Sequence, residues 1–202
     1  MPRRLRYQVA ASLDGFIARA NGEYDWIVGD PAIDFKALYA EFDTAVMGRK
    51  TYEVGLSQGG DLSMPGIDVI VFSRTLPSKH GRGMRVTSED PVEVVRALKA
   101  KPGRDIWLFG GGALFRTLLD AGLVDNVEIA LMPVLLGSGI PLLPPGADAK
   151  LALADQKTLR DSGIVVLAYT VVGGIAAPRI RYVKPRRAAK KKSKPKPRRR
   201  SQ

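Results

Sequence analysis

Three consecutive glycines carry the strongest chemical signal in this sequence. Gly110, Gly111 and Gly112 follow the apolar run 106–109 and precede a second apolar run, 113–121. Glycine has no Cβ, so backbone N–H groups here can approach a ligand closely. A helix that starts at this point would add the positive end of its dipole, which attracts phosphate. The pattern is also typical of a plain tight turn between a strand and a helix.

Two other segments place polar or basic residues at the end of an apolar run. Gly48 is followed by Arg49 and Thr51, which offer a charge and a hydroxyl group near a predicted helix start. Ser73 and Arg74 end another run. These two residue types can hold a ribose 2′-phosphate, because Arg can bind it through two hydrogen bonds. Taken alone, the first segment is more typical of a capped surface helix and the second of a solvated strand end.

Composition excludes several kinds of site. The 202 residues fit one domain with an appendage, and 45% of them are hydrophobic. There is no cysteine and only one histidine, His80, which excludes a thiolate metal site and a histidine cluster. A Ser-His-Asp triad would have to use His80. We find neither a signal peptide nor an apolar stretch of roughly 20 residues, so we expect a cytoplasmic protein without a membrane segment.

The net charge of +12 belongs to one end of the chain. Residues 176–202 hold 13 of the 32 Lys and Arg residues and none of the 20 Asp and Glu residues. We predict that this Lys/Arg/Pro-rich tail is disordered. Its basic run, 184–200, should attract nucleic acid or another polyanion without sequence specificity, because no aromatic residue stands among the charges to stack on bases. The alternative is a run that only aids solubility.

Alternating strand-like and helix-like runs predict a three-layer α/β/α domain over residues 1–175. The sheet should be mostly parallel, with an antiparallel pair of closing strands. The predicted strands are 5–13, 44–48, 68–73, 105–109, 125–132, 151–158 and 164–172, and the predicted helices are 35–42, 51–56, 92–101 and 113–121. Ligands bind beyond the carboxyl ends of strands in such sheets, so the three segments should share one phosphorylated ligand. The G-x-G-x-x-G fingerprint is absent.

Five segments in order resemble a known family. They are ASLDGFIA (11–18), MGRKTYE (47–53), VFSR (71–74), LFGGG (108–112) and PVLLGSG (133–139). Over residues 5–172 the chain resembles the dihydrofolate reductase-like superfamily. Within it, the chain is most similar to the reductase domain of the bifunctional deaminase-reductase of riboflavin biosynthesis.

The resemblance implies that NADPH lies across the carboxyl edge of the sheet. It assigns phosphate contacts to Gly48, Arg49 and Thr51, and the 2′-phosphate to Ser73 and Arg74. It also implies a cis peptide bond between Gly110 and Gly111. The remaining implied cofactor contacts are Gly112, Ala113 and Leu114 at the pyrophosphate, and Ala11 and Ile17 at the nicotinamide.

Two carboxylates are candidate catalytic residues. Asp14 would lie near the nicotinamide, where it could organise the proton that accompanies hydride transfer, although Asp-Gly is also a common turn pair. Asp34 begins the helix that carries a substrate carboxylate in dihydrofolate reductases. Its spacing to Gly48 departs from that pattern, and this favours a helix cap.

The resemblance implies a stand-alone reductase of a small pyrimidine or pteridine-like substrate, since no deaminase signature is present. It also implies a homodimer, which could form by pairing or packing of the apolar segment 164–172. The alternative is a non-catalytic nucleotide-binding protein that contacts nucleic acid through its tail.

Overall fold

The structure is a computed structural model, and it describes residues 3–172 except residues 58, 60, 61, 63, 82, 146 and 147. The basic tail that we predict to be disordered, 176–202, lies outside the described residues. No helix in the described part of the chain is both long enough and apolar enough to cross a membrane.

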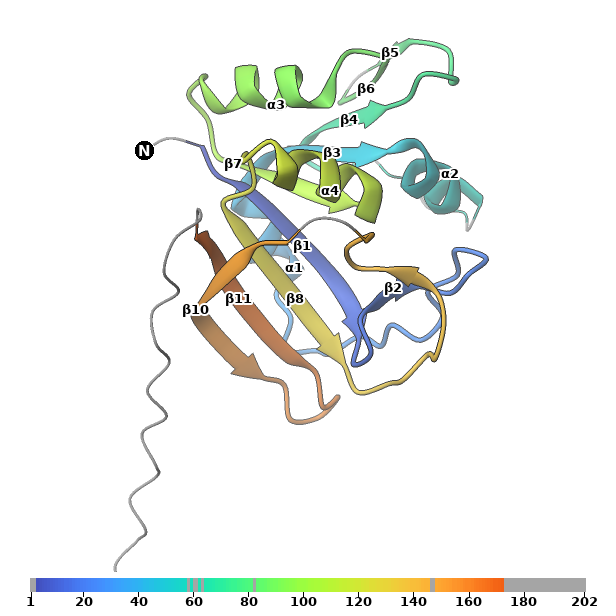
Figure 1. Ribbon diagram of the computed structural model, residues 1–202, viewed down its shortest axis with the longest axis vertical. Coiled ribbons are helices and arrows are strands. Elements are labelled where there is room, and N and C mark those ends of the chain that lie inside the picture. The colour runs from blue at the N-terminus through green and yellow to red at the C-terminus, as the bar shows by residue number, and fades with distance from the viewer. Residues whose placement is uncertain are drawn as a thin grey trace, which may run out of the picture.

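A twisted sheet forms the middle layer of the described chain (Figure 1). Its strand order is β10-β11-β8-β1-β7-β3-β4-β6-β5. The strands are β1 (Leu5–Ser12), β3 (Phe42–Gly48), β4 (Asp68–Phe72), β5 (Lys79–Gly81), β6 (Met84–Thr87), β7 (Asp105–Gly110), β8 (Asn126–Met132), β10 (Lys150–Thr158) and β11 (Val165–Val172). From β8 to β6 all neighbouring strands are parallel, whereas β11, β10 and β5 pair antiparallel. The predicted parallel sheet with two antiparallel closing strands is therefore confirmed.

Helices cover both faces of this sheet, which confirms the three-layer prediction. Helices α1 (Phe35–Ala40) and α2 (Arg49–Ser57) supply partly buried residues to the core on one face. Helices α3 (Pro91–Lys99) and α4 (Gly112–Asp120) pack on the other face. Two short strands, β2 (Phe16–Ala18) and β9 (Ile140–Pro141), pair with each other beside the main sheet.

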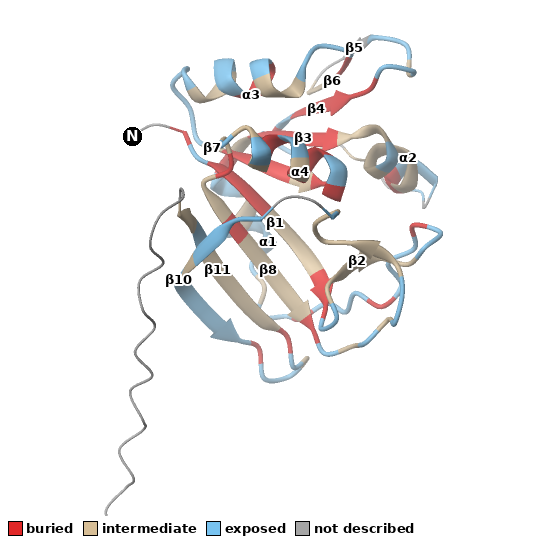
Figure 2. Cartoon of the chain, in the orientation of Figure 1, coloured by how far each residue is buried: buried red, intermediate tan, exposed pale blue. Residues whose placement is uncertain are grey.

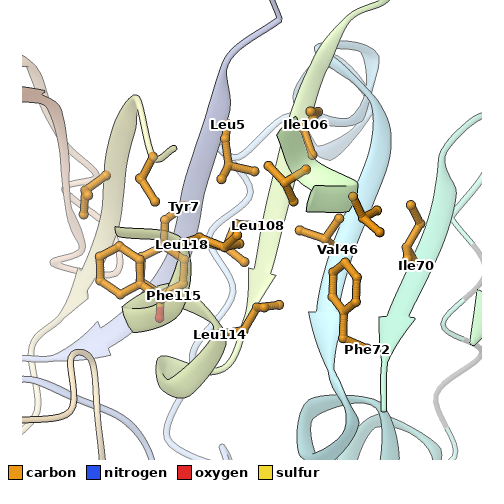
Figure 3. Close-up of a cluster of buried hydrophobic side chains, with 14 residues drawn as sticks. Leu5, Tyr7, Val46, Ile70, Phe72, Ile106, Leu108, Leu114, Phe115 and Leu118 are labelled. Carbon is orange, nitrogen blue, oxygen red and sulfur yellow. The ribbon is translucent and has the colours of Figure 1, made fainter. Parts of the chain in front are cut away.

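The core beneath α3 and α4 contains the largest group of buried apolar side chains (Figure 3). Leu5 and Tyr7 on β1 and Leu108 on β7 are fully buried there. The Tyr7 ring stacks on Phe115 of α4 with its centroid 3.9 Å away. Figure 2 shows that burial is concentrated on the inner strands, while β10 at the sheet edge is exposed. Apolar burial of this kind fixes α4 and β1 relative to each other.

The core on the opposite face corrects one sequence prediction. Phe42 was expected to end a helix because it follows Phe35 at helical spacing. Instead α1 ends at Ala40, and Phe42 is the fully buried first residue of β3. Its ring stacks on that of Trp107 with 5.3 Å between centroids. Tertiary packing, here the burial of the Phe42 ring against Trp107, therefore overrides the local helical periodicity.

Other differences concern short elements. Strands β2, β5, β6 and β9 were not predicted, because two to four residues give no measurable periodicity. Residues 164–172 form β11, which already pairs with β8 on one side and β10 on the other. The prediction that this segment pairs edge to edge with a second copy of the chain is therefore wrong. The homodimer itself stays a prediction.

Candidate active site

The three polar segments at strand ends meet at one edge of the sheet, as predicted. Gly48 at the end of β3 pairs with Phe72 at the end of β4. On its other side β3 pairs with β7, where Met47 lies opposite Gly110. The Ser73 amide donates to the Thr87 carbonyl oxygen at 2.9 Å and so continues the same edge to β6. The strand ends that carry the candidate phosphate contacts are therefore direct neighbours.

The same edge opens between β1 and β7. The pairing of these two strands stops at Tyr7 and Leu108. Beyond that point β1 continues beside β8 as far as Ser12, while β7 continues beside β3 as far as Gly110. Figure 1 shows the two halves of the sheet running in different directions. Ala11 and Gly110 thus stand on diverging strands that were partners lower down, at the kind of position where α/β sheets bind ligands.

The start of α4 is shaped for close approach and has no acid of its own. The predicted cis peptide bond between Gly110 and Gly111 is present. Gly111 is the N-cap residue, makes no side-chain capping bond, and no acidic residue lies in the first turn. A Cβ on Gly111 would lie 3.1 Å from the Thr51 hydroxyl oxygen, and one on Gly112 only 2.9 Å from the Pro141 carbonyl oxygen. First-turn amides have no partner inside a helix, so those of α4 can donate hydrogen bonds to an external anion.

The start of α2 contributes the positive charge of Arg49, which pairs with an acid in the same helix. Arg49 donates from Nη1 to both carboxylate oxygens of Glu53, at 2.9 and 2.8 Å. Both side chains are partly exposed, so this pair is weak and Arg49 can turn to another anion. No acidic residue lies in the first turn of α2. Thr51 borders Gly110 and Gly111, which places the start of α2 beside the glycine turn that precedes α4.

Ser73 and Arg74 have different surroundings. Ser73 is buried, and its hydroxyl oxygen accepts from the amides of Thr75 at 3.2 Å and Leu76 at 2.9 Å. It therefore shapes the turn after β4. Arg74 is exposed on that turn, and the described residues provide it with no ion-pair partner. Its guanidinium group is thus free to meet a phosphate.

Asp14 makes hydrogen bonds that sequence reasoning did not foresee. Its carboxylate accepts from the Ser12 hydroxyl at 2.6 Å, from the Gly137 amide at 2.7 Å and from the Leu136 amide at 3.1 Å. The Ser12 bond and then the two amides lower the pKa of the Asp14 carboxyl to about 2, although partial desolvation opposes them. A carboxyl group with that pKa is ionised at neutral pH.

Asp34 is the N-cap residue of α1. Its Oδ1 accepts from the Ala37 amide at 2.9 Å. The sequence spacing favoured this capping role, and the structure confirms it. Asp34 is exposed, so its second oxygen is open to solvent.

The other predicted contacts lie around the same edge. Ala11 and Leu114 are buried, Ile17 is half-buried and Ala113 is exposed at the start of α4. The residues that we missed are Ser12 and the amides of 136–137. The segment 133–139 was recognised only as a family motif. Its composition does not indicate that its backbone amides donate to Asp14.

Comparisons with known proteins identify the family of this chain. Residues 3–167 match the family described as the RibD C-terminal domain. The uncharacterized protein YyaP of Bacillus subtilis is 33% identical over 182 residues, covering 83% of this chain and 94% of that protein.

Two further similarities concern riboflavin biosynthesis. The riboflavin biosynthesis protein RibD of Mycobacterium tuberculosis is 28% identical over 148 residues, covering 66% of this chain and 43% of that protein. A crystal structure from Shewanella sp. PV-4, described as a candidate riboflavin biosynthesis protein, has a TM-score of 0.70 and 28% identity. That match covers 86% of this chain and all of the other. The dihydrofolate reductase-like fold is therefore confirmed.

Proposed function

Because the chain belongs to the RibD C-terminal domain family, we propose that it is an NADPH-dependent reductase of a small heterocyclic compound. The substrate class is a pyrimidine or a pteridine-like ring. One observation carries this proposal: a helix start without a capping side chain or acid, a glycine cradle and Arg74, which has no ion-pair partner among the described residues, lie along one opened sheet edge.

The residues at this edge fit a phosphorylated nicotinamide cofactor. The amides of Gly112, Ala113 and Leu114 would hold its pyrophosphate at the start of α4, with Gly111 giving the necessary clearance. Gly48, Arg49 and Thr51 would approach the phosphates from α2, and Arg74 would pair with the 2′-phosphate. Ser73 supports Arg74 by fixing its turn.

The nicotinamide end would lie where β1 and β7 separate, beside Ala11 and Ile17. When bound, the cofactor supplies a hydride, and a proton must reach the substrate to balance the reduction. Asp34 remains exposed at the start of α1 and could contact the substrate through its second oxygen. Water would be kept from the ring by the buried Ala11 backbone and the residues of β2.

The first test is a titration of the full chain with NADPH and NADH, followed by nicotinamide fluorescence. We expect NADPH to bind more tightly. Arg74→Ala should weaken NADPH on the order of tenfold to a hundredfold, because it removes a charge-assisted contact, and should leave NADH nearly unchanged. Arg160→Ala is the matched control, since Arg160 is exposed on the turn between β10 and β11, and five strands stand between β11 and β6 in the sheet, with β4 beside β6. Equal losses for both cofactors would refute the role of Arg74, and no binding of either would refute the reductase.

We also propose that the basic tail contacts polyanions as a separate property. The charge distribution supports it, because the tail holds 13 Lys and Arg residues with no acid. Removing residues 173–202 should abolish binding to duplex DNA of any sequence and leave NADPH affinity unchanged. In the full chain, DNA affinity should fall steeply as salt increases, because counterions are released on binding. DNA affinity that survives the truncation would place the contact on the folded domain instead.

A further inference from the structure

Two segments more than a hundred residues apart in sequence lock together beside the proposed cofactor site. We call the residues 12–18 and 134–142 the clasp. The Leu13 amide donates to the Val134 carbonyl oxygen at 2.8 Å, and the Leu142 amide donates to the Gly15 carbonyl oxygen at 2.9 Å. Directly after the second bond, β2 pairs with β9. The approach is so close that a Cβ on Gly139 would lie 2.3 Å from the Ala18 carbonyl oxygen. The clasp is thus a built contact of backbone on backbone.

Asp14 lies in the clasp between its two halves. It comes from the turn after β1, yet its carboxylate accepts from the amides of Leu136 and Gly137 in the other half. Ser12, which is fully buried, orders it: the Ser12 hydroxyl donates to Asp14 and accepts from the Phe16 amide at 2.9 Å. Gly137 has a φ of 72°, which turns this part of the segment toward the carboxylate. The two amides that donate to Asp14 from outside its own turn therefore both belong to the second half of the clasp.

The clasp continues directly into the wall of the α4 start. Its last residues, Pro141 and Leu142, place their carbonyl oxygens 2.9 and 3.3 Å from the position that a Cβ on Gly112 would occupy. Leu142 also packs against the core beneath α4. A shift of the segment 136–142 would therefore move the surface that faces the first turn of α4.

We propose that Asp14 is a positioning residue that fixes the clasp, and through it the wall of the cofactor site, rather than the group that delivers the proton. This inference rests on the proposed reductase function. The hydroxyl and the two amides that donate to the carboxylate favour its ionised form, so it carries no proton to give at neutral pH. The second half of the clasp, in contrast, has a direct structural use for it.

The experiment compares wild type with Asp14→Asn. The amide group keeps the size of the side chain but loses the charge and one acceptor, so the bonds from Leu136 and Gly137 should weaken. We expect hydrogen exchange of the peptide that covers residues 134–140 to accelerate, and the Kd for NADPH to rise about tenfold. The shape of the pH profile of kcat should stay the same. Asp161→Asn, at an exposed turn, is the control and should change neither quantity.

Ser12→Ala provides a second, milder test if Asp14→Asn folds poorly. It removes the Ser12 bond to Asp14 and the bond from the Phe16 amide but leaves the charge of Asp14 in place, so exchange and Kd should change in the same direction by a smaller factor. An Asp14→Asn protein with unchanged exchange and unchanged NADPH affinity would overturn the proposal. So would loss of the acidic limb of the kcat profile, which would assign Asp14 to proton delivery. If wild type itself fails to bind NADPH, the reductase proposal fails, while the exchange measurement still decides whether Asp14 holds the clasp.

The pH dependence of stability gives an independent readout. The Asp14 pKa is lowered from 3.8 to about 2 in the folded chain, so its ionised form stabilises the fold. That contribution should be complete above pH 3.8 and should disappear as the pH falls toward 2. The difference in Tm between wild type and Asp14→Asn should accordingly be constant from pH 7 to about 4 and shrink below that. A difference that persists at pH 2 would contradict the role of the carboxylate.

Discussion

Helices α3 and α4 pack side by side on one face of the sheet, and both begin at its carboxyl edge, but their first turns are opposite in character. At α3, Asp90 is the N-cap residue and its carboxylate accepts from the Val92 amide at 2.7 Å. Pro91 removes one more amide, and Glu93 adds a second acid. At α4, Gly111 offers no side chain, and no acid follows. The start of α3 carries a capping side chain and an acid, whereas the described residues give the start of α4 neither.

This difference separates a helix start that stabilises the fold from one that serves binding. An acid near a helix N-terminus contributes about 0.3 to 1 kcal/mol, and a good N-cap side chain contributes about 1 kcal/mol. Helix α4 lacks both contributions although it starts in an equivalent place. Functional sites are where local rules of this kind are most often broken. The comparison therefore supports the anion site at α4 and argues against one at α3.

The largest effect should come from giving α4 an acid like that of α3. Ala113 is exposed in the first turn of α4, so Ala113→Glu should fold normally and would place a carboxylate where the pyrophosphate is proposed to bind. Repulsion and competition for the amides should raise the Kd for NADPH on the order of a hundredfold. The Tm should stay the same or rise slightly, because the acid favours the helix dipole.

Ala97→Glu is the matched control for that substitution. Ala97 is exposed on α3, away from its first turn, and the change adds the same charge to the same face of the sheet. Its NADPH affinity, measured by the same fluorescence titration, should match that of wild type. Equal losses in the two variants would mean that overall charge, rather than the start of α4, governs cofactor affinity.

The features of both helix starts could be predicted from the sequence, because they depend on residues that are neighbours along the chain. Asp90-Pro91 marks a helix start by capping chemistry alone, and three glycines after an apolar run mark a loop of unusual backbone freedom. The meeting of Gly48, Arg74 and Gly110 at one edge also followed from sequence, since parallel strands direct their carboxyl ends the same way. Such inferences need only local pattern and the rule of sheet geometry.

The clasp could not be predicted, because it depends on contacts between distant segments. Asp14 and Gly137 are separated by 123 positions, and the partner is a backbone amide that any residue could supply. Asp14 was therefore placed near the chemistry by resemblance, with no sign of what its oxygens would accept. The prediction for Phe42 was wrong for a related reason. Its spacing from Phe35 fits a helix, and only its packing against Trp107 assigns it to β3.

The smallest effects should come from removing the acids that cap α3 and α1. Asp90→Ala and Asp34→Ala each delete one capping bond, so each should lower the free energy of unfolding by about 1 kcal/mol and leave NADPH affinity unchanged. Denaturant unfolding and the fluorescence titration measure the two quantities. Asp90 is the matched control for Asp34, because both cap a helix but only Asp34 stands where a substrate contact is proposed. If Asp34→Ala also raises the KM for substrate or lowers kcat tenfold or more while Asp90→Ala does not, Asp34 has a second role beyond its cap. If the two variants behave alike, the carboxylate of Asp34, like that of Asp90, acts only as a helix N-cap.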